Sequence, residues 1–463
     1  MREWSAGIRR IALVAMAGFA LQCAYLSYWQ VFRAPSLRAD EHNTRAQERL
    51  KRIEPGKLLD RHGDVMLDAR RTTRGWERVY PQGRDACHVT GYNSRSGVQS
   101  ALRDAFLGIG SYEKPWHEFI EGLDRGNDVR LTIDLRAQQL ATRLLRGQRG
   151  AVVALDARDG AVLAMVSAPG YDPETLLDND WEYNLFREDP TAPELNRALQ
   201  GLYPPGSVMK ILTAAAALDL GRVTPDTKLT CEGSCEVDGE VITCPRRHGS
   251  ITITQALELS CNVGFTKIGQ MIGADDFRGY VKRFHLLDQA NLPLPSAAGR
   301  MGELTGPRGK VMLAETAFGQ GQTLVTPMAI ARLTLAIASG GQVRQPYVVA
   351  AVLDAGGSTV NSRQALDLGR AVSAQTAAEV AGMMVGVVEE GTAQDAALRS
   401  VEVAGKTGSA ENPHGEPHAW FTAFAPADSP RVVVTVIVEN GGAGSEAAVP
   451  IARRVMQQLL SED

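Results

Sequence analysis

Residues 203–218, YPPGSVMKILTAAAAL, join a helix-breaking turn to a strongly apolar segment. Two prolines and a glycine cannot continue a preceding helix, so a new helix is predicted to begin at about Ser207. Ser207 and Lys210 would then share one helical face, where a neutral lysine amine can take the proton of the hydroxyl. The helix N-terminus also offers backbone N–H groups to an anionic intermediate. Taken alone, such a serine is more often an N-cap, so further motifs are needed.

A second polar pair follows the apolar segment 253–259. Ser260 and Asn262 flank Cys261. In a loop between two helices, both side chains can project into one cleft. The serine can then shuttle a proton, and the carboxamide can bind a substrate amide. In isolation, a polar loop end explains the same residues.

A third group, Lys406-Thr407-Gly408-Ser409, stands at the end of an apolar-alternating segment that is predicted to be a strand. Lys406 and Thr407 on an edge strand can bind a carboxylate, and Gly408 lets a substrate backbone approach closely. The backbone N–H of Ser409 can complete an oxyanion hole with that of Ser207. By itself this group would be read as a solvated strand end.

The first 33 residues differ from the rest of the chain. An apolar run from Ile11 to Val31 is long enough to cross the roughly 30 Å hydrocarbon core of a bilayer. Arg2, Arg9 and Arg10 precede it, so the positive-inside rule predicts a cytoplasmic N-terminus and an extracytoplasmic remainder. A cleaved signal peptide fits less well, because the run is long and ends in bulky aromatic residues. A lipoprotein signal ending at Cys23 also fits less well, because Gln22 stands where such a signal needs a small residue. We expect an uncleaved, single-span membrane anchor.

Four further cysteines lie close together in the sequence: Cys231, Cys235, Cys244 and Cys261. The first three, with His248, have a spacing that suits a tetrahedral zinc site. In an oxidising compartment a disulfide is the simpler outcome. We therefore favour a Cys231–Cys244 bridge and assign no metal, although spacing alone leaves the connectivity open.

The length of 463 residues suits two or three domains, and the composition is that of a globular protein. Residues 1–33 form the anchor, 34–128 a small spacer domain and 129–463 the main domain. The spacer contains a predicted hairpin, with arms at 58–59 and 65–67. The net charge is −4 and no block of Lys and Arg stands out, so no nucleic-acid partner is expected.

The main domain is predicted to have strands at both ends and helices between them. Asp134 can cap a helix at about 135–145, and the segments 151–155 and 161–166 form a second hairpin. After a helix-rich middle at about 207–340, we expect strands at 401–407, 419–424 and 432–438 and a final helix at about 446–460. The sequence thus predicts an α+β fold in which one sheet is assembled from both ends of the domain.

Together and in this order, S-x-x-K, S-x-N and K-T-G are the motif set of penicillin-binding proteins and serine β-lactamases. From about residue 129 onward the sequence resembles the transpeptidase domain of class B penicillin-binding proteins. Further segments look like family landmarks: 150–156, 164–167, 196–198, 318–321 and 418–421 in the main domain, and 60–63 in the spacer. With its anchor, short spacer and residues 89–92, the chain is most similar to the compact actinomycete type called penicillin-binding protein A. The resemblance implies an antiparallel sheet flanked by helices, as in serine β-lactamases.

The resemblance also implies roles for the motif residues. Ser207 would be the acylated nucleophile, Lys210 its general base, and Ser260 the relay of a proton to the leaving group. Asn262, Lys406, Thr407 and Gly408 would bind the donor stem peptide, and the N–H groups of Ser207 and Ser409 would form the oxyanion hole. Ser409 stands where the family usually has threonine, but only its backbone is needed.

The reaction implied is attack on the penultimate D-alanyl carbonyl, loss of the terminal D-alanine, and capture of the acyl-enzyme by an amine of a neighbouring stem. β-Lactams would acylate the same serine, no cofactor is needed, and a membrane glycosyltransferase is the implied partner. A role in division, elongation or differentiation stays open, as does the third residue of the stem peptide.

Other readings of the motifs remain. Residues 193–196, PELN, resemble the glutamate-bearing loop of a class A β-lactamase, but they precede Ser207, whereas that loop follows S-x-N. A D,D-carboxypeptidase would use the same residues with water as acceptor. A non-catalytic β-lactam sensor or scaffold is disfavoured, because every motif residue is intact.

Overall fold

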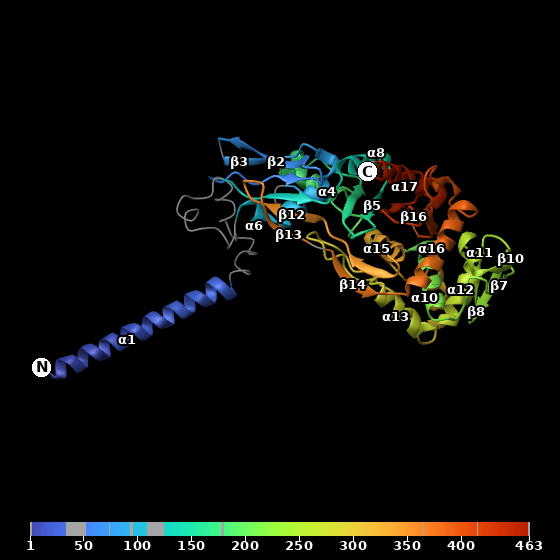
Figure 1. Ribbon diagram of the computed structural model, residues 1–463, viewed down its shortest axis with the longest axis horizontal. Coiled ribbons are helices and arrows are strands. Elements are labelled where there is room, and N and C mark those ends of the chain that lie inside the picture. The colour runs from blue at the N-terminus through green and yellow to red at the C-terminus, as the bar shows by residue number, and fades with distance from the viewer. Residues whose placement is uncertain are drawn as a thin grey trace.

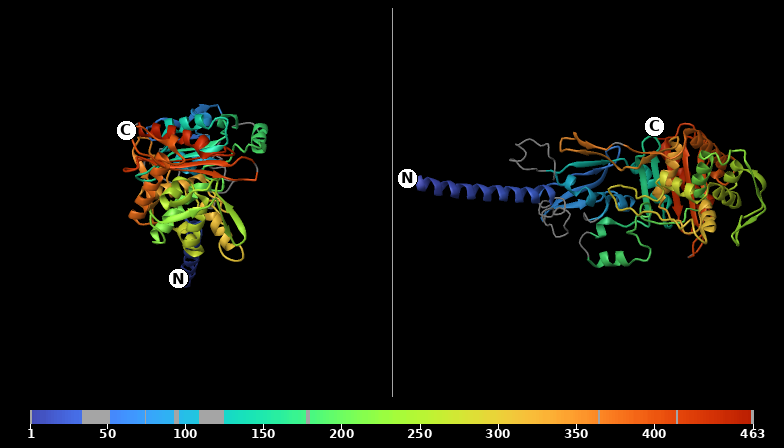
Figure 2. Two further views of the ribbon diagram at one scale, coloured as in Figure 1. Left: turned by 90° about the vertical axis from the view of Figure 1, so that its right-hand side faces the viewer. Right: turned by 90° about the horizontal axis from the view of Figure 1, so that it is seen from below.

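The computed structural model describes an elongated body and a separate N-terminal helix, α1 (Arg2–Ser27) (Figure 1). The described residues are 2–33, 52–73, 75–92, 96–108, 125–176, 180–363, 365–413 and 415–461. Within the body, the spacer elements lie at one end and part of the helix-rich middle of the chain lies at the other (Figure 2).

The main sheet is antiparallel and five-stranded. In spatial order its strands are β15 (Ala404–Ala410), β16 (His418–Ala425), β17 (Val432–Val438), β5 (Gly150–Asp156) and β6 (Val162–Ala168). β17 pairs directly with β5, so the sheet joins the two ends of the predicted main domain, as expected. Every residue of β17, β5 and β6 is buried, which explains why these segments are almost continuously apolar.

β15 is an edge strand, because β16 is its one neighbour in the sheet among the described residues. It begins at Ala404, later than expected, and continues to Ala410. Lys406, Thr407, Gly408 and Ser409 therefore lie within the strand, whereas the sequence suggested that they close it. The ladder continues through the motif, since all four residues pair with β16.

Helices cover both faces of this sheet (Figure 1). α17 (Gly444–Leu460) and α8 (Leu135–Leu144) pack on one face, and α15 (Pro327–Ala338) and α16 (Ala374–Glu389) pack on the other. Asp134 caps α8 as predicted, since its carboxylate accepts a hydrogen bond from the Ala137 N–H at 3.0 Å.

The part of the chain that follows Ser207 is mainly helical. Its helices are α10 (Lys210–Asp219), α11 (Ile253–Glu258), α12 (Asn262–Ile272), α13 (Ala274–Arg283) and α14 (Gly309–Phe318). Between α10 and α11 the chain forms two small antiparallel ladders that the sequence did not predict. β7 (Lys228–Cys231) pairs with β10 (Gly249–Thr252), and β8 (Ser234–Val237) pairs with β9 (Glu240–Thr243).

The spacer forms a second, mixed sheet of six strands. Their spatial order is β13 (Thr359–Ser362), β12 (Val349–Leu353), β4 (Asp128–Leu131), β1 (Leu58–Leu59), β2 (Val65–Thr72) and β3 (Gly75–Val79). β1 and β2 form the predicted hairpin. β12 and β13 come from far along the chain, so hydrogen bonds link the spacer to the main domain. We keep a boundary near residue 128 as a proposal, with β12 and β13 added to the spacer sheet.

Shorter elements complete the described chain. They are η1 (Tyr28–Phe32), η2 (Gly83–Asp85), α4 (Cys87–Thr90), α5 (Gly97–Ala101), α6 (Arg103–Phe106), η3 (Pro173–Leu176), α9 (Asp180–Glu188), η4 (Gly206–Met209), β11 (Gln342–Gln345), β14 (Leu366–Arg370) and η5 (Gln394–Ala396). β11 and β14 form a separate two-stranded ladder.

The N-terminal helix has the length and composition of a membrane span. The segment Gly7–Phe32 has a mean hydropathy of 1.6 and none of it is buried against the body. It contains the predicted run from Ile11 to Val31, and it is the one candidate span in the described parts of the chain. This helix is consistent with a single-span anchor.

Candidate active site

The structure brings the three sequence motifs together at the exposed edge of β15. Ser207 lies in the turn η4, and Lys210 is the first residue of α10, so the helix begins where the sequence predicted. Ser260 lies in the short loop after α11, and Asn262 opens α12. A cleft of about 600 Å³ is lined by Ser207, Ser260, Asn262, Thr407, Gly408 and Ser409, among others.

Lys210 is fully buried at the centre of the site. Its Nζ atom lies 3.0 Å from Ser207 Oγ, and it donates to the Ser260 carbonyl oxygen at 2.7 Å and to Asn262 Oδ1 at 2.8 Å. Burial lowers the pKa of Lys210 to about 7, although nearby Cys261 and Cys244 act in the opposite direction. A neutral amine is therefore readily available at this position near neutral pH.

The Ser260–Asn262 loop connects the two lysines. Ser260 Oγ lies 3.2 Å from Lys210 Nζ and 3.0 Å from Lys406 Nζ. The backbone of Ser260 has a left-handed φ of 55°, which few residues adopt without strain. Asn262 Nδ2 donates to the Thr243 carbonyl oxygen at 3.2 Å, so Oδ1 of the same amide is turned toward Lys210.

Lys406 is as deeply buried as Lys210. Burial lowers its pKa well below the ordinary value, and the neighbouring Lys210 lowers it further by charge repulsion. Its Nζ atom also donates to the Thr407 carbonyl oxygen at 3.0 Å. The Thr407 hydroxyl contacts that of Thr392 at 2.5 Å, and Thr392 is a cleft residue that the motifs did not indicate.

Three glycines let the turn that contains Ser207 pack tightly. Gly206 has a φ of +56° and its N–H donates to the Gly319 carbonyl oxygen at 2.8 Å. A Cβ atom on Gly319, whose φ is +93°, would lie 1.7 Å from the Gly206 carbonyl oxygen. Gly408 lies beside the same turn, since a Cβ atom there would be 3.4 Å from the Ser207 amide nitrogen. The edge strand and the end of α14 thus fix the position of Ser207.

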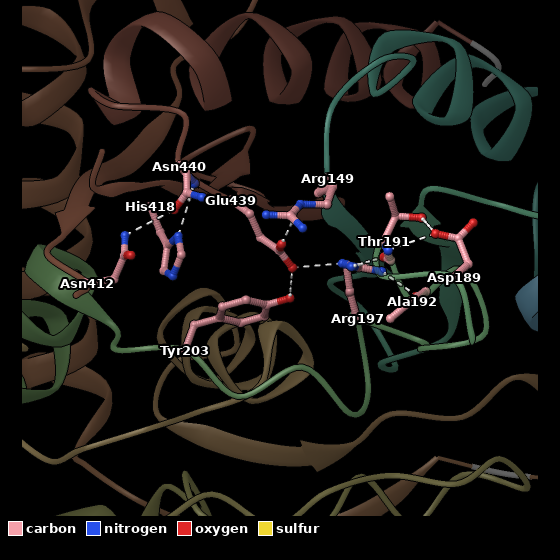
Figure 3. Close-up of polar contacts among 10 residues, drawn as sticks. All are labelled: Arg149, Asp189, Thr191, Ala192, Arg197, Tyr203, Asn412, His418, Glu439 and Asn440. Carbon is pink, nitrogen blue, oxygen red and sulfur yellow. Dashed lines mark hydrogen bonds and ion pairs between the residues drawn. The ribbon is translucent and has the colours of Figure 1, made fainter. Parts of the chain in front are cut away.

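A buried polar network supports the segment that leads to Ser207 (Figure 3). Glu439 accepts hydrogen bonds from Arg197 Nε and from the Tyr203 hydroxyl, both at 2.7 Å, and pairs with Arg149 at 3.2 Å. Burial raises the pKa of Glu439, but these donors and cations outweigh it and hold the pKa below its ordinary value. A hydrogen bond also fixes Pro204, which follows Tyr203: Trp420 Nε1 donates to its carbonyl oxygen at 3.0 Å.

Glu194, in the segment that resembled a β-lactamase loop, is not part of the cleft that contains Ser207. Its carboxylate accepts a hydrogen bond from the Tyr92 hydroxyl at 2.9 Å and lines a separate cavity with His88 and Phe186. This position supports reading the segment as structural.

The cysteines differ from the expectation. All six are free thiols in the described residues, so the favoured Cys231–Cys244 disulfide is not formed. Instead, Cys231, Cys244, His248 and Cys261 converge, with ligand atoms within 4.8 Å of one another. Cys261 comes from the Ser260–Asn262 loop and takes the place that spacing had given to Cys235. The sequence prediction joined cysteines that are close along the chain. In the fold, α12 packs against β7 and β9, which brings Cys261 to the other ligands.

Comparison with known proteins agrees with this geometry. Residues 150–457 match the family described as the penicillin binding protein transpeptidase domain. The chain is 34% identical to the peptidoglycan D,D-transpeptidase PbpA of Mycolicibacterium smegmatis, covering 98% of this chain and 99% of the relative. It is 33% identical to the protein of the same name from Mycobacterium tuberculosis, with the same coverage.

Solved structures give the same picture. A ceftriaxone acyl-enzyme complex of penicillin-binding protein A from M. tuberculosis superposes with a TM-score of 0.83 at 31% identity, covering 90% of this chain and all of that one. The matched domain spans the main sheet and all three motifs, and the relatives match over nearly the full length. The chain therefore belongs to the penicillin-binding protein transpeptidase family.

Proposed function

We propose that this protein is a peptidoglycan D,D-transpeptidase that works through an acyl-enzyme on Ser207. The observation that carries the proposal is the distance of 3.0 Å between Lys210 Nζ and Ser207 Oγ inside a cleft that also contains the other motif residues. The similarity to two proteins named peptidoglycan D,D-transpeptidase supports the choice of substrate.

The surroundings of Lys210 favour a basic amine. Its two shortest contacts are to the Ser260 carbonyl oxygen and to Asn262 Oδ1, which can only accept hydrogen bonds. A neutral amine has two N–H groups and one lone pair. Once the N–H groups are used on these acceptors, the lone pair remains for the hydroxyl proton of Ser207. Lys210 is thus the general base of acylation.

The remaining residues act on the substrate. Ser207 Oγ attacks the penultimate D-alanyl carbonyl carbon, and the N–H groups of Ser207 and Ser409 stabilise the resulting oxyanion. As the bond to the terminal D-alanine breaks, Ser260 passes a proton to the departing amine. Asn262, Lys406 and Thr407 bind the donor peptide, with Gly408 allowing close approach. An amine of a neighbouring stem then attacks the ester, which releases Ser207.

The acyl-enzyme is tested by incubating the full-length protein, in detergent, with a fluorescent penicillin. We expect a covalent adduct on the peptide that contains Ser207, located by mass spectrometry, and no adduct in Ser207→Ala. Ser429→Ala is the matched control, because Ser429 is exposed on the turn between β16 and β17 and lies outside the cleft. Labelling that persists in Ser207→Ala refutes the assignment.

Transpeptidation is separated from hydrolysis by a thioester mimic of the stem peptide with a D-amino acid acceptor. A transpeptidase yields the exchange product in preference to the free acid. Free acid alone would favour a D,D-carboxypeptidase, and rapid turnover of penicillin would favour a β-lactamase.

The location of the enzyme is also part of the proposal. Arg2, Arg9 and Arg10 precede the apolar run from Ile11 to Val31, so the short N-terminus is cytoplasmic and the cleft faces the cell wall. A membrane glycosyltransferase is the partner that would supply new strands. Protease added to intact spheroplasts should digest the body of the protein. Full protection would indicate that the body lies in the cytoplasm, opposite to the proposed orientation.

A further inference from the structure

Four potential metal ligands meet directly behind the Ser260–Asn262 loop. Cys231 ends β7, Cys244 follows β9, His248 precedes β10, and Cys261 lies between α11 and α12. Cys231 and Cys261 are completely buried, with no exposed side-chain surface. Three segments of chain therefore place soft ligands at one interior point.

The two separations that involve Cys244 match a tetrahedral zinc site, and all four ligand atoms lie within 4.8 Å of one another. With Zn–S bonds of about 2.3 Å and Zn–N bonds of about 2.0–2.1 Å, tetrahedral geometry requires about 3.8 Å between two sulfurs and about 3.6 Å between sulfur and nitrogen. Cys244 Sγ lies 3.8 Å from Cys261 Sγ and 3.5 Å from His248 Nδ1. Both separations suit ligands that share one ion.

Backbone hydrogen bonds hold the ligands in this arrangement. The Cys244 N–H donates to the Gly233 carbonyl oxygen at 2.8 Å, and the His248 N–H donates to the Cys231 carbonyl oxygen at 3.2 Å. The Gly264 N–H donates to Cys261 Sγ itself at 3.2 Å, which stabilises a thiolate at that position. The site is thus organised by the loops around it, and not by the side chains alone.

We propose that Cys231, Cys244, His248 and Cys261 bind one Zn²⁺ ion in a closed, four-coordinate site. Each cysteine binds as a thiolate after losing its proton, and His248 binds through Nδ1 as a neutral ring. Because all four positions are filled by the protein, none is left for water or substrate, so the ion is structural. Three thiolates also favour zinc over the hard cations Ca²⁺ and Mg²⁺.

The ion would connect the small ladders to the catalytic loop. Cys261 lies between Ser260, which contacts both lysines, and Asn262, which contacts Lys210. A ligand fixed at position 261 therefore limits the movement of both neighbours. This goes beyond the proposed function in assigning an ion that positions its loop, while the binding of the ion itself does not depend on that function.

A disulfide between Cys244 and Cys261 is the competing outcome. It would use two of the four ligands and leave Cys231 and His248 without a role. The two outcomes differ in metal content and in the number of free thiols, and both quantities can be measured on the unaltered protein.

The test begins with the full-length wild-type protein, purified in detergent without chelators. We expect about one zinc per chain by inductively coupled plasma mass spectrometry. Alkylation without reductant, before and after zinc is removed with a chelator under denaturing conditions, should show that the ligand cysteines are reduced. A protein without zinc, or one whose intact mass shows a Cys244–Cys261 bridge, would overturn the proposal.

Variants then identify the ligands. Cys231→Ser and His248→Ala should each lose most of the zinc, whereas Cys235→Ser should keep it. Cys235 is a matched control, because it lies in β8 of the same region but outside the four-residue cluster. Zinc content that is unchanged in Cys231→Ser and His248→Ala would refute this ligand set.

Acylation by the fluorescent penicillin is recorded separately on the same samples. Loss of zinc should slow acylation at least several-fold in Cys231→Ser relative to Cys235→Ser. Zinc bound without any labelling of Ser207 would contradict the proposed function and leave the metal site standing. Rapid labelling of a wild-type protein that contains no zinc would contradict the metal site and leave the proposed function standing.

Discussion

Two fully buried lysines, Lys210 and Lys406, contact the same hydroxyl of Ser260. Two ammonium groups this close repel each other, and burial already disfavours each charge. The site therefore favours a state in which one lysine is neutral. Lys210 is the one with two acceptor-only neighbours and with Ser207 within reach.

The acylation rate should depend on pH. Because the pKa of Lys210 is lowered to about 7 and the neutral amine is the active form, the acylation rate should rise with pH through about 7 and level off above it. One pH unit below the midpoint, about one-tenth of the amine is neutral, so the rate should fall about tenfold. Stopped-flow measurement of penicillin acylation gives this profile. A midpoint near the ordinary lysine pKa would contradict it.

Lys406→Ala should slow acylation about 100-fold or more, since it removes a buried amine donor next to Ser260 and the substrate carboxylate. The measurement is the second-order rate constant with the fluorescent penicillin. Lys282→Ala is the control, because Lys282 is an exposed lysine on α13. An unchanged rate in Lys406→Ala would remove Lys406 from the site.

The motif residues could be predicted from sequence because each type has a definite chemical use and the order of the motifs is distinctive. Cys261 could not, since the middle residue of S-x-N carries no chemical expectation of its own. Its importance depends on which side chains lie behind the loop, and Cys231 and His248 reach that place only through the fold.

The turn η4, which contains Ser207, lies between β15 and the end of α14. Gly319 caps α14 with a φ of +93° and receives the N–H of Gly206 on its carbonyl oxygen. The turn therefore has little freedom to move without disturbing two other elements.

Gly319→Ala tests this packing. The new Cβ atom would overlap the Gly206 carbonyl oxygen, so the variant should be destabilised and acylated more slowly, by at least tenfold. Gly273→Ala is a control for backbone strain, because Gly273 also has a positive φ, +83°, but no atom within 4 Å of the added carbon. It should show only the cost of backbone strain, about 1–3 kcal/mol. Thermal unfolding and acylation rates report both effects; equal behaviour of the two variants would exclude a steric cause.

The network around Glu439 gives another prediction. Glu439→Gln leaves the guanidinium of Arg197, whose side chain is 3% exposed, without its carboxylate partner. Removal of one member of a buried pair costs about 3 kcal/mol. Chemical denaturation should show this loss, while Glu303→Gln, which breaks an exposed pair with Arg278, should change stability little. A stability loss no larger than that of the control would show that the carboxylate charge is dispensable.

Strongly apolar elements were the easiest to predict. The β5–β6 hairpin and α10 are buried along almost their whole length, so nearly every position in them favours an apolar residue. β8 and β9 were not predicted, because they are four residues long and mostly exposed, which leaves no clear alternation. β12 is partly exposed as well, and its partner β4 lies more than 200 residues earlier.

The chain crosses more than once between the five-stranded main sheet and the six-stranded spacer sheet. β1 to β4 come from the N-terminal part of the chain. β12 and β13 join the same sheet after α15, when the chain has already formed β5 and β6 of the main sheet. The main domain therefore contributes strands to the spacer, and neither can unfold without breaking hydrogen bonds of the other.

This arrangement predicts one cooperative unfolding transition for the body of the protein. Differential scanning calorimetry should show a single peak, and penicillin acylation at Ser207 should move the whole peak to higher temperature. Two peaks, of which only one responds to penicillin, would mean that the spacer and the main domain unfold independently.

The free edge of β15 has a consequence for how the protein meets its substrate. The outer edge of an edge strand presents a row of N–H and C=O groups to which an extended peptide can pair as an added strand. Such recognition reads the shape of a main chain more than the identity of its side groups. In each catalytic cycle the bound peptide would extend the five-stranded sheet by one strand. Such a site tolerates different side chains on the peptide but requires that its backbone be extended.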